Sequence, residues 1–78
     1  MKEFVEYVIK QLVDKPEEVN VLEITGESTV IFELRVDQGD MGKVIGRSGQ
    51  TAKSLRTIVG AAAAKQGRRS VLEILEGG

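Results

Sequence analysis

The segment Thr29–Asp37 alternates between apolar side chains and mostly charged ones. This period of two is typical of a β-strand with one buried face. Its apolar side carries Val30, Phe32, Leu34 and Val36. A chain of 78 residues without cysteine has room for one core and no disulfide to stabilise it, so helices or a second sheet must cover this face. We therefore expect a single two-layer domain over residues 1–78.

Apolar spacing and breaker residues indicate the elements of the first half of the chain. Apolar residues recur every three or four positions over Lys2–Val13, which predicts an amphipathic helix that ends before Pro16. Asn20–Thr25 is expected to be a strand, with Leu22 and Ile24 on one face. A three-residue turn containing glycine joins it to the alternating segment, so the two strands should form a hairpin.

Two helices and a last strand are expected in the second half. A short helix over Met41–Ile45 has Asp40 as a candidate N-cap. A long helix over Gln50–Gln66 is followed by Gly67, where a C′ glycine belongs. The β-branched and apolar run Ser70–Leu75 predicts the final strand. The expected fold is therefore α+β: a three-stranded sheet with three helices on one face, in the order α-β-β-α-α-β.

Charge is segregated along the chain. Residues 1–40 carry four basic and ten acidic side chains, whereas residues 41–72 carry seven basic and no acidic ones. A charged run is often only a solvated face, but so long a segment without a carboxylate favours a partner that bears phosphates. The seven basic residues are Lys43, Arg47, Lys53, Arg56, Lys65, Arg68 and Arg69.

Several classes of function are disfavoured by what the chain lacks. It has no histidine and no cysteine, so we expect no metal site, no cofactor and no catalytic residues. It has neither a membrane-spanning apolar run nor a signal peptide, so a cytoplasmic protein is expected. The glycine spacings of dinucleotide folds and P-loops do not occur. Phe4 and Tyr7 fall on the first helix and Phe32 points inward, which leaves no aromatic pair to stack on bases.

The loop Gly46-Arg47-Ser48-Gly49 is the motif with the clearest chemistry. Gly46 is expected to close the short helix with a positive φ, and Gly49 to let another backbone segment approach closely. Free N–H groups and the positive end of the next helix would then point at one place, with Arg47 and Ser48 as further donors. This arrangement favours an anion. The alternative left open is a plain corner between two helices.

The run Gly42-Lys43-Val44-Ile45-Gly46-Arg47-Ser48-Gly49-Gln50, with Leu55 downstream, resembles the Val-Ile-Gly-x-x-Gly signature of KH domains. The element order is similar to the prokaryotic type II form, and a free-standing domain of this size resembles the small bacterial KhpA family of RNA-binding proteins. On this resemblance the KH core spans about 29–76, preceded by helix 2–14 and strand 20–25. Ala52 departs from the branched aliphatic residue that KH motifs usually carry there.

The resemblance implies a clamp that holds the backbone of about four single-stranded nucleotides. Ile45, Ala52 and the strand around Val71 would line an apolar groove for the bases, and Arg68 would lead a basic track into that strand. For Arg56 and Lys65, RNA contact and simple solvation are equally open. The residues expected to bind RNA are Lys43, Ile45, Gly46, Arg47, Ser48, Gly49, Lys53 and Arg69.

The function expected on this basis is non-catalytic binding of single-stranded RNA, with weak sequence preference, as an RNA chaperone or post-transcriptional regulator. A different class of function stays open beside it. The chain could serve as a protein–protein adaptor in a regulatory complex, with weak or no RNA binding of its own.

The long helix carries small residues on one side. Leu55, Ile58, Val59 and Ala62 form the stripe expected to face the sheet. The opposite side holds Thr57, Gly60, Ala61 and Ala64, where a solvated helix normally carries long polar side chains. Small residues allow two helices to approach closely, so a homodimer through this face is expected, and the resemblance adds pairing with a larger KH-containing protein. The alternative is that the alanines only favour helix formation.

Overall fold

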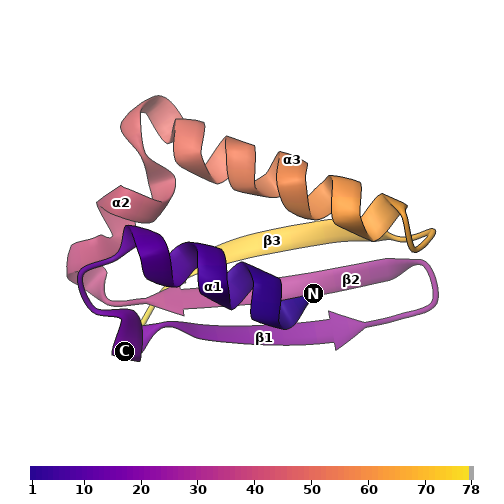
Figure 1. Cartoon of the computed structure of the whole chain (residues 1–78), viewed down its shortest axis with the longest axis horizontal. Helices are drawn as coiled ribbons and strands as arrows, with labels where there is room; N and C mark the ends of the chain where they lie inside the picture. The colour runs from indigo at the N-terminus through magenta and orange to yellow at the C-terminus, as the bar shows by residue number, and fades with distance from the viewer. Residues whose placement is uncertain (78) are drawn as a thin grey trace.

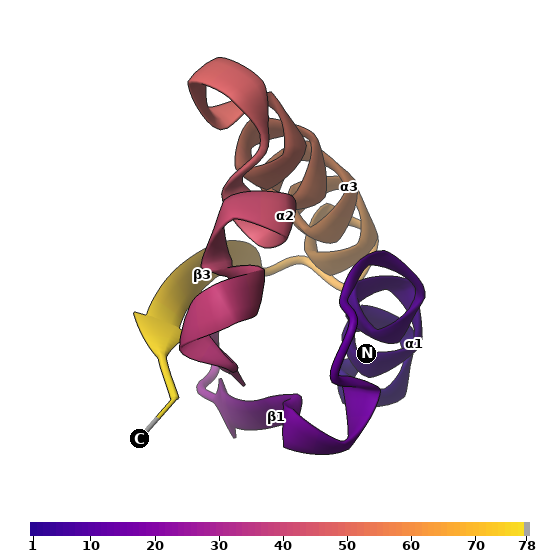
Figure 2. The same cartoon turned by 90° about the vertical axis from the view of Figure 1, so that its left-hand side faces the viewer.

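The computed structural model describes residues 1–77 as a three-stranded sheet with three α-helices on one face (Figures 1 and 2). The expected fold class and the order α-β-β-α-α-β are confirmed. The elements are α1 (Lys2–Leu12), β1 (Asn20–Thr25), β2 (Thr29–Val36), α2 (Met41–Ile45), α3 (Gln50–Ala64) and β3 (Arg69–Glu76). Short 3₁₀ turns occupy Pro16–Glu18, Gln38–Asp40 and Arg47–Gly49.

The central strand of the sheet is β2. It pairs antiparallel with β1, with Asn20 opposite Arg35, and parallel with β3, with Thr29 opposite Arg69. The parallel pair needs a crossover, which α2 and α3 supply. As the alternation predicts, the inward side chains of β2 are buried, and those of Phe32, Leu34 and Val36 are fully inaccessible to solvent.

Side chains from all three helices pack on the inner face of the sheet, Val44 from α2 among them. From α1, Val5 and Ile9 enter the core. From α3, Leu55 and Val59 are buried as expected.

The expected stripe of α3 is otherwise wrong, because Ile58 is 47% exposed and Ala62 only half-buried. Ala52 and Ala63 are buried instead. Burying two alanines lets the helix lie close to the sheet and turns the larger Ile58 outward. Periodicity identifies such a stripe only to within about one residue on either side.

The long helix ends at Ala64, two residues before the expected Gln66, and the predicted glycine turns the chain after it. Gly67 has a φ of 72°, and its N–H donates to the carbonyl of Ala64 over 3.0 Å. The next amide, that of Arg68, donates to Ala63 over 3.0 Å. This pair of bonds is a Schellman motif, which satisfies the last helical carbonyls and turns the chain into β3.

Asp40 is not the side-chain N-cap that the sequence predicts for α2. Asp40 is 2% exposed, and its carboxylate accepts hydrogen bonds from the backbone N–H groups of Asp14, over 3.1 Å, and Lys15, over 3.0 Å. Burial acts to raise the pKa of Asp40, but the two backbone hydrogen bonds and the nearby Lys43 ammonium outweigh it and lower the pKa. Asp40 thus ties the chain after α1 to the start of α2.

The outer face of the sheet carries no helix between residues 1 and 77 (Figure 2). Leu22 and Ile24 of β1 and Val71 of β3 lie on this face and are exposed. None of the helices in the described part of the chain is long and apolar enough to cross a membrane.

Candidate nucleic-acid interface

The loop between α2 and α3 forms one corner of the molecule, above α2 in Figure 1. Three of its four residues have positive φ: 77° at Gly46, 55° at Ser48 and 74° at Gly49. The predicted positive φ at Gly46 is confirmed. Ser48 is the non-glycine residue with positive φ among residues 1–77, and nothing in the sequence predicts it.

The close approach expected at Gly49 occurs at Gly46 instead. Nothing lies within 4 Å of where a Cβ on Gly49 would stand, so this glycine supplies only its positive φ. A Cβ on Gly46 would lie 2.7 Å from the Cβ of Thr51, in the first turn of α3. The two glycines of the motif therefore have different roles.

The backbone of the loop leaves donors available at its tip. The Gly46 N–H closes α2 on the carbonyl of Gly42 over 2.9 Å, and the Gly49 N–H donates to the Gly46 carbonyl over 3.2 Å. Within residues 1–77, the amides of Arg47 and Ser48 make no hydrogen bond to a protein acceptor, and both side chains are exposed. The N-terminus of the 15-residue helix α3 follows directly. Such a corner can bind an anion.

The predicted cations of the site differ in their surroundings. Arg47 stands exposed at the loop tip, and Lys53 lies one turn into α3. Lys43, in contrast, forms ion pairs with Asp14 over 3.0 Å and with Asp40 over 3.8 Å. The hydrogen bond and the charge of Asp14 raise the pKa of Lys43. Part of the charge of Lys43 is therefore neutralised within the fold.

The expected groove residues are only partly brought together. Ile45 is 39% exposed and directly precedes the loop, whereas Ala52 is buried and offers little surface. Val71 pairs with Ile31 on the outer face, so Leu72 and Ile74 are the apolar residues of this strand that face the helices. The expected strand Ser70–Leu75 is present and extends by one residue at each end, to Arg69 and Glu76.

Arg69 stands apart from the loop. It begins β3, where it pairs with Thr29, and its side chain is exposed on the same face of the sheet as Val71. In Figure 1 this end of β3 lies beneath the C-terminal end of α3, opposite the loop. Arg68 is held here too, because its Nε donates to the carbonyl of Gly26 over 3.0 Å.

Arg56, which the sequence leaves undecided, is placed beside β3. Its Nε donates to the carbonyl of Leu72 over 3.3 Å. The two residues are 16 positions apart, and no sequence pattern predicts that they meet. The structure thus adds a cation between α3 and the edge of the sheet.

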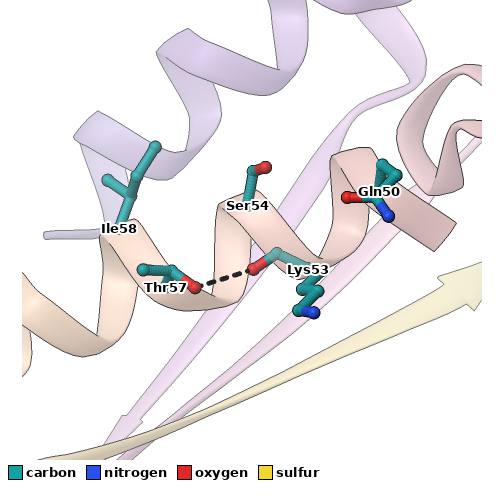
Figure 3. A pocket seen from close by; sticks show the side chains of 5 residues that line it. All are labelled: Gln50, Lys53, Ser54, Thr57 and Ile58. Carbon is teal, nitrogen blue, oxygen red and sulfur yellow. Dashed lines mark hydrogen bonds between the residues drawn. The ribbon is translucent and has the colours of Figure 1, made fainter.

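The outward side of α3 carries a shallow hollow of about 410 Å³, shown in Figure 3. The hydroxyl of Thr57 donates to the carbonyl of Lys53 over 3.1 Å and so turns back onto its own helix. Beyond the hollow, Ala61 and Ala64 are exposed, while Gly60 is half-buried beside Ser70. The hollow is lined by Gln50, Lys53, Ser54, Thr57 and Ile58.

The chain is similar to known proteins over nearly its whole length. A family model described as the KhpA/KhpB KH domain matches residues 2–74. A relative from Clostridium perfringens, named RNA-binding protein KhpA, is 55% identical over 75 residues, which cover 96% of this chain and 100% of the relative. Relatives of the same name from Aquifex aeolicus and Chlamydia trachomatis are 54% and 49% identical over 76 residues, covering 97% of this chain and 96% and 97% of the relatives. No solved structure matched the chain.

Proposed function

Because the chain belongs to the KhpA/KhpB KH-domain family, we propose that it binds single-stranded RNA through Gly46–Gly49 and acts by binding rather than by catalysis. Relatives about half identical to it are named RNA-binding proteins. The observation that carries the proposal is the loop itself. It turns through three residues with positive φ, and the amides of Arg47 and Ser48 have no protein acceptor within residues 1–77, at the start of a long helix.

The mode of binding follows from what the loop offers. Backbone amides and the Arg47 guanidinium are donors for phosphate oxygens, and Lys53 adds charge one turn further on. A KH loop holds about four nucleotides by their backbone, so sequence preference should be weak. Such binding suits an RNA chaperone or post-transcriptional regulator in the cytoplasm.

The test is a double substitution at the loop tip, Arg47→Asp with Ser48→Asp. Both side chains are exposed, so the variant should fold, and two carboxylates at the anion site should repel the phosphate. The matched control is Lys65→Asp with Gln66→Asp, which changes the net charge equally at the far end of α3. Filter binding to mixed-sequence RNA oligonucleotides should show loss of affinity for the loop variant alone.

The outcomes separate the two classes of function. If the folded loop variant binds RNA as well as the unmodified protein, the loop is not the clamp. If the unmodified protein itself binds no RNA, the proposal fails and the alternative function as a protein–protein adaptor is favoured.

We also propose that the outward side of α3 pairs with a second copy or with a larger KH-containing protein. Ala61 and Ala64 are exposed and small there, and the adjoining hollow ends at the exposed Ile58. A Cβ on Gly60 would lie 3.6 Å from the Ser70 hydroxyl, an ordinary contact, so packing within the chain does not require glycine at this position. Two paired loops would bind RNA more tightly than one.

A further inference from the structure

The hydrogen bond between Arg56 and Leu72 lies at the free edge of the sheet. In the strand order β1-β2-β3, one side of β3 faces β2, and no strand within residues 1–77 lies beside the other. The amides of Arg69 and Gly77 donate to Ser28 and Val36, which places the backbone groups of odd-numbered residues toward β2. Those of even-numbered residues, Leu72 among them, therefore point to the free edge.

Helix α3 runs antiparallel to this edge. Gly60 lies beside Ser70, and four residues earlier on the helix Arg56 lies beside Leu72. Continuing toward Gly49, the helix rises away from β3 and reaches the loop (Figure 1). The seven residues from Gly49 to Arg56 cover about 10 Å of helix axis. Arg56 thus lies at one end of a short helical stretch that begins at the loop. We call this stretch, Gly49–Arg56, the track.

Arg56 keeps most of its binding capacity. A guanidinium has five N–H donors, and only the Nε–H is used on the Leu72 carbonyl. Among residues 1–77, the two terminal amino groups of Arg56 have no hydrogen-bond partner, and no carboxylate forms an ion pair with it. Lys43 has two carboxylates beside it, whereas Arg56 is held by a neutral carbonyl and retains its full charge.

We propose that Arg56 is a further RNA-binding residue, positioned by the Leu72 carbonyl, which contacts a phosphate at the end of the track away from Gly46–Gly49. This inference rests on the proposed RNA binding of the loop. Its single bond to a backbone carbonyl orients the guanidinium before RNA arrives, so less side-chain entropy is lost on binding. A purely structural role would be to protect the edge of β3 from pairing with another strand.

The experiment compares three variants with the unmodified protein. Arg56→Met removes the charge and keeps the aliphatic stem, whereas Arg56→Lys keeps the charge and loses the planar fork. Lys65→Met is the matched control, because it removes one charge just past the C-terminal end of α3, nine residues on from Arg56, which is about half a turn away around the helix axis. Affinity for a mixed-sequence RNA octamer is measured at several salt concentrations, and thermal unfolding is measured in parallel.

The proposal expects Arg56→Met to weaken RNA binding about tenfold, since a charge-assisted hydrogen bond is lost. For Arg56→Met, the slope of log affinity against log salt concentration should become less negative by about 0.7, which is the contribution of one phosphate contact on a single strand. Arg56→Lys should restore the slope and part of the affinity. Lys65→Met should leave both unchanged.

Other outcomes overturn the proposal. If Arg56→Met binds RNA with unchanged affinity and slope, Arg56 does not contact RNA, whatever happens to its melting temperature. If Lys65→Met loses as much RNA affinity as Arg56→Met, only the total charge of the protein determines the affinity. An Arg56→Lys variant with the weakened slope of Arg56→Met would contradict a phosphate contact. If the unmodified protein binds no RNA, the proposed function fails first, which is a different result.

Discussion

The side chain of Thr51 packs against the Cα of Gly46, in the space that the Cβ of any other residue would need. A Cβ at Gly46 would lie 2.7 Å from the Cβ of Thr51 and 2.9 Å from its backbone nitrogen. Both are shorter than non-bonded carbon contacts allow, and the backbone nitrogen in the first turn of α3 cannot move alone. This contact couples the end of α2 to the start of α3 and so holds the loop in shape.

Replacing the two glycines of the loop should therefore have unequal effects. Gly46→Ala combines a positive φ with overpacking and should lower the free energy of unfolding by about 2–5 kcal/mol. Gly49→Ala meets no neighbour within 4 Å, and its positive φ alone should cost about 1–2 kcal/mol. Urea unfolding measures both values. Equal losses would show that Thr51 does not make this contact.

Replacing Ser48 with glycine should stabilise the protein. Its φ of 55° is unfavourable for any L-residue with a Cβ, so Ser48→Gly should raise the free energy of unfolding by about 1 kcal/mol. For a domain of this size that is a rise in melting temperature of about 4–8 °C. Ser48→Val, with a β-branched side chain at the same φ, should melt lower than the unmodified protein. Differential scanning calorimetry decides, and a Ser48→Gly variant that melts lower would mean that its hydroxyl stabilises the turn.

The buried Asp40 carboxylate should make stability depend on acid. Burial alone would raise its pKa, but the backbone hydrogen bonds from Asp14 and Lys15 and the charge of Lys43 lower it below the ordinary 3.8. A group with a lowered pKa in the folded state stabilises the fold above the unfolded pKa. That contribution is lost as the pH falls from about 3.8 through the folded pKa.

The matched variant for this prediction is Asp40→Asn, which keeps the shape and cannot ionise. Between pH 6 and pH 2, the free energy of unfolding should fall more steeply for the unmodified protein than for Asp40→Asn. The gap between their two unfolding free energies should therefore narrow as the pH falls. Denaturant unfolding at several pH values measures the gap. A gap that stays constant would contradict the lowered pKa of Asp40.

RNA binding should weaken as salt rises. If Arg47, Lys53 and Arg56 each neutralise one phosphate of a single strand, the slope of log affinity against log salt should be about −2. Lys43, already paired with Asp14 and Asp40, should add little. Titrations at four or more salt concentrations give the slope. A flat response would assign the affinity to base contacts instead of to these cations.

Pairing through α3 should be sensitive to one added charge. Ala61→Glu places a carboxylate on the exposed small-residue face and should give a folded monomer with weaker RNA binding. Gln38→Glu, in an exposed turn before α2, is the control and should leave the oligomeric state unchanged. Light scattering at high micromolar concentration reports the mass. An unmodified protein that is already monomeric there would refute self-association through this face.

Local patterns in the sequence are sufficient to predict most of the fold. The alternation of Thr29–Asp37 places its inward side chains correctly, because a strand exposes every second residue to the same side. Gly67 turns the chain after the long helix as expected, because few other residues adopt a positive φ at low cost. The loop Gly46–Gly49 can also be recognised from the sequence, because the residues that give it its chemistry are four consecutive ones.

Contacts between residues far apart in the chain became visible only in the tertiary structure. Asp40 bonds to amides 25 and 26 positions away instead of capping its own helix, and Arg56 meets the carbonyl of Leu72 16 positions away. The rotation of α3, which exposes Ile58 and buries Ala63, is set by how closely the helix can approach the sheet. Periodicity determines which residues share a side of a helix or strand. Which side is buried, and which polar groups then find each other, is determined by packing against elements that no local pattern describes.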